Sequence, residues 1–348
     1  MKVGIVGYKS SGKSTIFGAL TGNPDPPLRP NEVRLGTIRV PDPRIDRLSE
    51  IFQPKKTVYA EVAFADLPGV PREGGGGLPN SFIEQVKNLD ALALVVRGFE
   101  SPYVVDAPDP LREFNDFVVE LALADQIQVE RRLERLAKEG KRGDREYALF
   151  ERMLAHLEEG RPLRTAGLDE GEWRVLTGYQ FASSRPILVV LNLDESAEAE
   201  AALRPMRGAI EEQAAHGLAL SGQIELEVAS LEPDERAPFL ADLGLDEPAS
   251  ARFIRGAYAL LDLVSFFTVG PDEVRAWTIS RGTRAPGAAG KIHSDLERGF
   301  IRAEVTKYDD QVSVNGNQGE LRKAGKLAIE GKDYVVSDGD VLNIRHNT

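Results

Sequence analysis

The sequence predicts a doubly wound α/β domain that carries a helical hairpin, followed by a small, mostly β domain. A glycine-rich loop, Gly7 to Ser14, lies between a short apolar run and an amphipathic segment. Continuous apolar runs recur at 91–96 and 186–191, as expected of buried parallel strands. From Phe266 onward the pattern changes to short strands separated by Gly-rich turns. These observations divide the chain into domains 1–263 and 264–348.

The first strand, helix and intervening loop predict a phosphate site. Val3 to Val6 has the character of a buried strand, and the segment after Ser14 places Ile16 and Leu20 on one helical face. The loop has the pattern G-x-x-x-x-G-K-[ST], in which backbone N–H groups cradle a polyphosphate, the Lys reaches the β/γ-phosphates and the hydroxyl ligates Mg²⁺. The alternative is a chance Gly-rich turn. The expected nucleotide-binding residues are Gly7, Ser10, Ser11, Gly12, Lys13, Ser14 and Thr15.

A second element on the phosphate side follows at 58–69. The alternating run 58–65 predicts a strand that ends in Asp66-Leu67-Pro68-Gly69. Asp66 at the strand end suits a Mg²⁺-bound water, so Ser14 and Asp66 are the expected metal residues, and the N–H of Gly69 suits a γ-phosphate. Alone, D-x-x-G is equally typical of a plain β-turn. Gly74 to Gly77 is a linker or, as we favour, a switch that moves with phosphate state.

An insertion of helical pattern at about 112–165 predicts an antiparallel helical hairpin with its turn at 140–143. Seven basic residues face three acidic ones over 131–145, a local charge of +4. The charges favour contact with nucleic acid; the alternative is a solvated face with i,i+4 ion pairs. The basic residues are Arg131, Arg132, Arg135, Lys138, Lys141, Arg142 and Arg145.

The run 186–191 ends in Asn192-Leu193-Asp194-Glu195, the place where guanine-specific proteins carry N-K-x-D. A longer carboxylate at Glu195 fits the guanine edge poorly, so strict GTP specificity is not expected. The alternation of 224–228 predicts a strand that delivers Ala229 and Ser230 to the base. Asn192 and Glu195 have another interpretation, as caps of the next helix.

Composition narrows the class of protein. The 348 residues include no Cys, which excludes disulfides and thiolate metal sites. No apolar run reaches the roughly 18 residues needed to span a bilayer. The net charge of −12 argues against a general nucleic-acid coat. We expect a cytoplasmic protein with no membrane contact.

These motifs, in this order, resemble the YchF or Obg-like ATPase family over nearly the whole chain. The similarity is closest at 274–279, 289–305 and 330–334. It implies that the C-terminal domain is a TGS domain with a β-grasp fold, and that Asn192 to Glu195 is the family's N-x-x-E base motif, with backbone groups around Leu193 contributing. It also implies ATP at least as readily as GTP, Mg²⁺, slow hydrolysis, and association of a monomer with the ribosome and ribosomal RNA.

The chain departs from the family pattern at several positions. Lys9, Ser10 and Ser11 replace P-N-V of the phosphate loop. By a gap-free count, Pro30 occupies the place of the switch Thr that ligates Mg²⁺, and Tyr103 that of a catalytic His. Val70 follows Gly69, so no polar side chain there orients an attacking water. No catalytic residue is identified, and two hypotheses remain: a slow ATPase or GTPase acting at the ribosome, or a non-hydrolysing nucleotide-binding adaptor.

Overall fold

The computed structural model describes residues 1–22, 32–72 and 77–347. Pro30, and Gly74 to Gly76 of the expected switch, lie outside these ranges. The chain forms two compact units. Unit 1 comprises Met1–Ile38 with Ala63–Leu260, and unit 2 comprises Arg39–Val62 with Leu261–Thr348. The break after Leu260 lies close to the predicted division at 263, but unit 2 also takes in Arg39–Val62, which that division assigns to the first domain.

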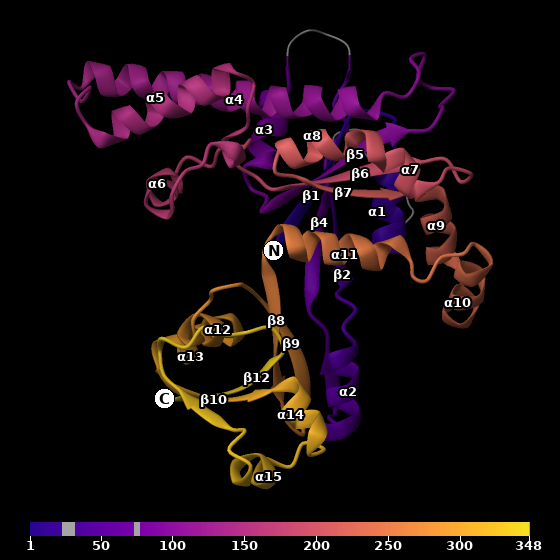
Figure 1. Ribbon diagram of the computed structural model, residues 1–348, viewed down its shortest axis with the longest axis vertical. Helices are drawn as coiled ribbons and strands as arrows, with labels where there is room; N and C mark the ends of the chain where they lie inside the picture. Colours follow the sequence, from indigo (N-terminus) through magenta and orange to yellow (C-terminus); the bar gives the residue numbers. More distant parts are fainter. Residues whose placement is uncertain (23–31, 73–76, 348) are drawn as a thin grey trace. The chain divides into compact units, whose positions relative to one another are not determined.

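Unit 1 is built on a six-stranded sheet in the order β2-β4-β1-β5-β6-β7. The neighbours from β4 to β7 pair in parallel, so their carboxyl ends meet at one edge, where doubly wound folds bind ligands. Helices cover both faces (Figure 1). The strands are β1 Lys2–Val6, β2 Arg34–Arg39, β4 Glu61–Asp66, β5 Ala91–Gly98, β6 Ile187–Leu193 and β7 His216–Leu220.

The apolar runs at 91–96 and 186–191 form the central strands β5 and β6. In β5 seven of eight residues are buried and in β6 all seven are, because helices exclude water from both faces. The helices of unit 1 are α1 Lys13–Thr21, α3 Asn80–Val86, α4 Pro110–Lys138, α5 Arg145–Glu158, α6 Glu170–Leu176, α7 Ala199–Leu203, α8 Arg207–Glu212, α9 Gly222–Ser230, α10 Pro233–Asp242 and α11 Ala249–Leu260, with 3₁₀ turns at Leu163–Thr165 and Arg204–Met206.

The predicted helical hairpin is present and extends beyond the sheet (Figure 1). α4 has 29 residues, about 44 Å at 1.5 Å per residue. Its outer half packs on α5 through Val129, Leu133 and Phe150. At the base, the buried carboxylate of Asp125 accepts hydrogen bonds from the N–H groups of Ala182 and Ser183 (2.9 and 2.7 Å) and from the Ser183 hydroxyl (2.6 Å).

Unit 2 contains a mixed six-stranded sheet in the order β11-β10-β12-β8-β9-β3. β8 and β9 form an antiparallel hairpin, α12 follows, and β10 returns antiparallel to β12, which is parallel to β8. The fold class predicted from the sequence is confirmed. The elements are α2 Pro43–Phe52, β3 Lys56–Val58, β8 Leu263–Val269, β9 Glu273–Ser280, α12 Ala285–Ile292, α13 Ser294–Arg298, β10 Phe300–Lys307, α14 Tyr308–Ser313, α15 Gln318–Lys323, β11 Ala328–Glu330 and β12 Asp340–His346.

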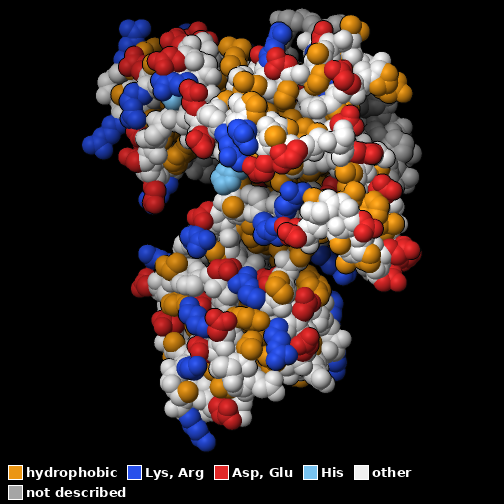
Figure 2. All heavy atoms as spheres, turned by 45° about the vertical axis from the view of Figure 1, so that its right-hand side comes forward, with side chains coloured by type: hydrophobic (Ala, Val, Ile, Leu, Met, Phe, Trp, Pro, Cys, Tyr) orange, Lys and Arg blue, Asp and Glu red, His pale blue; other side chains and the backbone are white. Residues whose placement is uncertain are grey.

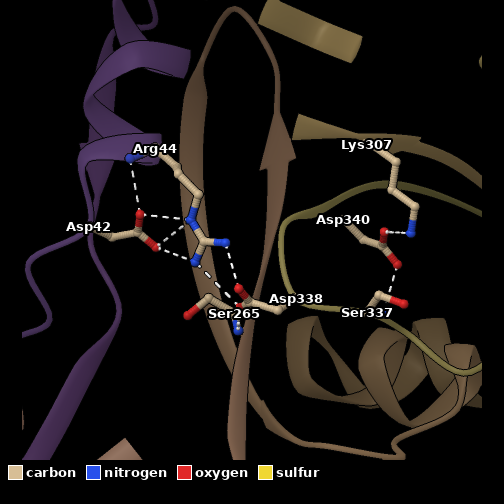
Figure 3. Close-up of polar contacts among 7 residues, drawn as sticks. All are labelled: Asp42, Arg44, Ser265, Lys307, Ser337, Asp338 and Asp340. Carbon is tan, nitrogen blue, oxygen red and sulfur yellow. Dashed lines mark hydrogen bonds and ion pairs between the residues drawn. The ribbon is translucent and has the colours of Figure 1, made fainter. Parts of the chain in front are cut away.

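The segment 39–62 is tied into unit 2 by a polar network (Figure 3). The guanidinium of Arg44 contacts both Asp42 (2.8 Å) and Asp338 (2.7 Å), and Asp338 also accepts from the N–H of Ser265 (2.8 Å). Burial alone would raise the pKa of Asp338, but the hydrogen bonds from Arg44 and Ser265 outweigh it, so this pKa is lowered. The short strand β3 pairs with β9 in parallel.

Two predicted strands differ from the structure. The run 58–65 is divided between β3 and β4, which belong to different sheets, with Tyr59 and Ala60 between them. The prediction of a strand at 224–228 is wrong, because these residues lie in α9. Ile224 and Val228 are four positions apart, a spacing that puts two residues on one face of a helix and also on one face of a strand. Five alternating residues therefore fit either period.

Candidate functional site

The predicted phosphate loop lies between the end of β1 and the start of α1. Gly7 has φ 144° and Gly12 has φ 87°, a region that residues with a Cβ rarely adopt. A Cβ on Gly7 would approach the carbonyl oxygen of Val95 at 2.4 Å, and one on Gly12 would approach Nδ2 of Asn192 at 2.0 Å. The loop geometry therefore requires both glycines.

Lys13 is buried at the floor of this loop. Its ammonium donates to the carbonyl of Tyr8 at 2.9 Å, and its side chain is only 6% exposed. Burial, opposed by the carboxylates of Asp66 and Glu113, lowers the pKa of Lys13 to about 8. A Cβ on Gly69 would lie 2.9 Å from this nitrogen, so the glycine's backbone directly faces the ammonium. The structure thus brings Lys13 and Gly69 together.

Ser14 and Asp66 also meet. The Ser14 hydroxyl donates to Oδ2 of Asp66 at 3.3 Å, and Asp66 is 5% exposed. Within the described residues, Oδ1 of Asp66 and the hydroxyl of Ser11 are buried without a hydrogen-bond partner. A hydroxyl and a carboxylate are hard oxygen ligands of the kind Mg²⁺ takes beside phosphates, so the donor set fits this ion. No cluster of three or more His, Asp or Glu elsewhere in the described chain offers a different metal site.

The sequence did not reveal that Asp66 already has a cationic partner. Arg34 of β2 donates from Nη2 and Nε to Oδ2 of Asp66, at 2.6 and 3.1 Å. The guanidinium also lies over the ring of Phe17, 4.5 Å from its centroid. Arg34 is 32 positions from Asp66, too far for spacing alone to indicate the contact.

Asn192 joins the phosphate loop to the neighbouring strand ends. Its amide donates to the carbonyl of Ser11 at 3.0 Å and accepts from the N–H of Gly222 at 2.9 Å. The alternative interpretation as a helix cap is not realised, since the cap of α7 is Glu198. Leu193 is buried, and Glu195 is exposed.

The prediction of a turn at Ala229 and Ser230 is wrong. Both residues end α9, at its C-terminal end. The residues that follow a strand here are Ser221 and Gly222, after β7, and Gly222 contacts Asn192. Ser221 caps α9 through a bond from the N–H of Ile224, and a Ser before an apolar periodic run is a helix-start signal that identifies this position in the sequence.

The segment around Tyr103 is where the family pattern leads us to expect a catalytic group. Tyr103 is 88% exposed. The adjoining residues 106–109 line a cavity of about 700 Å³ together with Tyr8, Arg72 and Glu113. Val70 is buried and its carbonyl accepts from the N–H of Lys9 at 2.8 Å. Its side chain offers nothing to hold a water.

The basic residues of the hairpin form a surface on its outer end, where blue side chains mix with red ones (Figure 2, upper left). Six of the seven are exposed and Arg132 is half-buried. Arg132 pairs with Glu146 (2.6 Å) and Lys141 with Glu139 (2.7 Å). Among the described residues, no ion-pair partner occupies the other five: Arg131, Arg135, Lys138, Arg142 and Arg145.

No helix in the described ranges is both long and apolar enough to cross a membrane.

Known proteins match this chain over nearly its whole length. Residues 2–131 match a family described as 50S ribosome-binding GTPase, and residues 263–347 match the family YchF-GTPase_C, described as a protein of unknown function. The chain is 40% identical to Ribosome-binding ATPase YchF of Haemophilus influenzae, over 99% of both chains. It is 36% identical to the protein of that name in Bacillus subtilis, over 100% of this chain and 99% of the other.

Two further likenesses extend to eukaryotes. Obg-like ATPase 1 of rice is 35% identical, over 100% of this chain and 92% of its own. The structure of the Schizosaccharomyces pombe YchF GTPase superposes with a TM-score of 0.85 at 29% identity, covering 99% of this chain and 97% of that one. Full-length identity at this level, together with the phosphate loop and the C-terminal match, shows that the chain belongs to the YchF or Obg-like ATPase family.

Proposed function

We propose that this protein is a cytoplasmic, monomeric, ribosome-associated factor that binds ATP or GTP with Mg²⁺ at the loop 7–15 and hydrolyses it slowly. The observation that carries the proposal is the preformed phosphate cradle. The Lys13 ammonium already lies at the floor of the loop, beside Gly69. Gly7 and Gly12 give the loop a backbone conformation that a residue with a Cβ could not adopt there. Such a loop at a helix N-terminus recognises phosphate.

Each residue has a distinct part in binding. The backbone of Gly7 to Thr15 donates to phosphate oxygens, and Lys13 neutralises the β/γ charge. Ser14 and Asp66 would hold Mg²⁺, which supplies charge neutralisation at the terminal phosphates. Asn192 fixes the loop against the strand ends, while the backbone at Leu193 and the carboxylate of Glu195 face the base.

Nucleotide preference follows from the same residues. The carboxylate of Glu195 is longer than the Asp of guanine-specific sites, and Leu193 replaces their Lys. We expect ATP to bind within about tenfold of GTP, or more tightly, a difference of roughly 1.4 kcal/mol or less. Competition of the two nucleotides for one site measures this ratio.

A second function, the non-hydrolysing adaptor, is favoured by a specific observation. Val70 has an apolar side chain and Tyr103 is 88% exposed, so neither supplies a buried polar group to orient an attacking water. In that case phosphate occupancy alone would set the state of the protein.

The deciding experiment is a turnover assay with Mg²⁺, with and without ribosomes, on the parent and on Lys13→Ala. Slow turnover in the parent alone supports the first function; tight binding without turnover supports the second. Calorimetry on folded Lys13→Ala should show that most triphosphate affinity is lost. Unchanged affinity would remove the phosphate-loop assignment.

A further inference from the structure

Arg34 is a charged side chain in the magnesium region of the site that the binding scheme above does not use. Asp66 is buried and Arg34 is mostly so: the Asp66 side chain is 6% exposed and that of Arg34 is 11%. Two N–H groups of the guanidinium point at one oxygen, Oδ2, at 2.6 and 3.1 Å, and the flat face rests on Phe17. The planar cation is thus held by a carboxylate on its edge and an aromatic ring on its face.

The oxygen that Arg34 occupies is also the one that faces Ser14. The Ser14 hydroxyl lies 3.3 Å from Oδ2 of Asp66, and these two residues are those expected to hold Mg²⁺. A fixed positive charge therefore sits on the carboxylate to which a divalent ion would be drawn. Only Oδ1, which has no partner among the described residues, is left for a metal-bound water.

Displacing Arg34 is unfavourable. Removing the guanidinium would leave Asp66 buried and without the cation hydrogen-bonded to it, and loss of one partner from a buried pair is strongly destabilising. With Arg34 in place, the Arg34–Asp66 pair carries little net charge, and Lys13 beside it repels an incoming cation. Mg²⁺ therefore gains less here than beside an unpaired carboxylate.

We propose that Arg34 supplies part of the positive charge that Mg²⁺ brings to a phosphate loop, so that nucleotide affinity in this protein depends only weakly on Mg²⁺. The inference rests on the proposed nucleotide site and adds that its charge balance is met partly by a side chain. Arg34 acts here as a positioning and charge-supplying residue on Asp66, not as a catalytic one.

The test is the affinity of the full-length protein for a fluorescent, non-hydrolysable ATP analogue, measured in saturating Mg²⁺ and in excess EDTA. In the parent, EDTA should weaken binding by less than about tenfold. In Arg34→Ala the same change should weaken binding at least about tenfold more than in the parent, and half-saturation by Mg²⁺ should move to lower concentration. Arg39→Ala is the matched control, because Arg39 is exposed on the same strand and stacks on Tyr59 instead.

Two further variants keep the test decisive. Arg34→Gln retains an amide donor if Arg34→Ala does not fold, and should show the same increase in Mg²⁺ dependence. Arg34→Lys keeps the charge and should stay near the parent. Equal Mg²⁺ dependence in the parent, Arg34→Ala and Arg34→Gln would overturn the inference alone, as would loss of more than about a hundredfold in the parent on adding EDTA. Absence of binding by the parent even in Mg²⁺ would instead overturn the proposed function, and the inference with it.

Discussion

Lys13 shows how burial prepares a side chain for an anion. In the folded protein its ammonium is almost removed from water and contacts one carbonyl oxygen. A triphosphate returns the charge stabilisation that water no longer supplies, so binding and protonation of Lys13 favour each other.

This coupling predicts that nucleotide affinity falls as pH rises. The pKa of Lys13 is lowered to about 8, and phosphate prefers the protonated form. The fraction protonated falls from about ten elevenths at pH 7 to about one eleventh at pH 9, so affinity should fall about tenfold over this range. Fluorescence titration of the parent measures the change. Lys13→Met should bind weakly with no such slope, and a flat profile in the parent would contradict the prediction.

The residues of the site differ in how readily the sequence indicates them. Gly7 to Ser14 are contiguous, and the loop's chemistry requires their spacing, so the pattern alone locates them. The pair Arg34 and Asp66 joins two separate strands, and Asn192 reaches Ser11 across 181 positions. Such contacts depend on the order of strands in the sheet, which no local pattern encodes.

At the scale of single elements, α4 combines two environments. Its first half packs on the sheet and its second half forms one arm of the hairpin. Asp125 lies where they meet, and its three hydrogen bonds fix the segment after the hairpin to the helix. Burial raises the pKa of Asp125 to about 6, an effect that these bonds and Lys87 oppose.

Asp125→Ala should therefore lower the free energy of unfolding by about 2–4 kcal/mol, because two N–H groups and a hydroxyl lose their acceptor inside the protein. Urea denaturation at neutral pH measures it. Asp116→Ala, on the same helix but 55% exposed in its ion pair with Arg112, should cost less than about 0.5 kcal/mol. A similar small loss at Asp125 would show that the hairpin base does not depend on this carboxylate.

The outer end of the hairpin carries the prediction about RNA. Phosphate contacts depend on charge and not on base sequence, so Lys141→Glu with Arg142→Glu should weaken ribosome co-sedimentation. The salt dependence should also flatten, by about 0.7–0.9 in log–log slope per lost contact. Arg174→Glu with Arg204→Glu makes the same charge change on exposed residues outside α4 and α5. If the two double variants sediment alike across a salt series, the basic residues are a solvated face.

Elements differ in predictability for a physical reason. The hairpin has two long arms whose apolar residues recur at helical spacing, so its period is unambiguous. Ile224 to Val228 is too short to separate a period of 2 from one of 3.6, and the structure resolves it as α9. The run 58–65 alternates throughout, yet its two ends join different sheets, which alternation cannot indicate.

At the scale of the whole molecule, the structure differs most from the predicted domain division in the residues that make up unit 2. Arg39–Val62 contributes α2 and β3, and Ile45 and Leu48 of α2 are fully buried. Ile51 and Phe52 also lie against Gly316. Nothing in the composition of this segment marks it as belonging with residues 200 positions later.

We predict that residues 261–348 alone are less stable than the same residues with 39–62 joined through a flexible Gly/Ser linker. Loss of two fully buried aliphatic side chains alone accounts for at least about 3 kcal/mol. Chemical denaturation of the two fragments compares them, with an unrelated linker-joined peptide of equal length as control. Equal midpoints would mean that α2 and β3 are peripheral to this unit.

The divided origin of unit 2 has a consequence during synthesis. The parallel pairing of Lys56 to Val58 with Glu273 to Arg275 cannot form until the later strand has left the ribosome. At roughly 5–20 residues per second, the 199 positions from Val62 to Leu261 take about 10–40 s to translate. For that interval a nascent chain carries a helix with a bare apolar face and a strand without its neighbour. This interval should be the period in which the newborn protein is most open to chaperone capture.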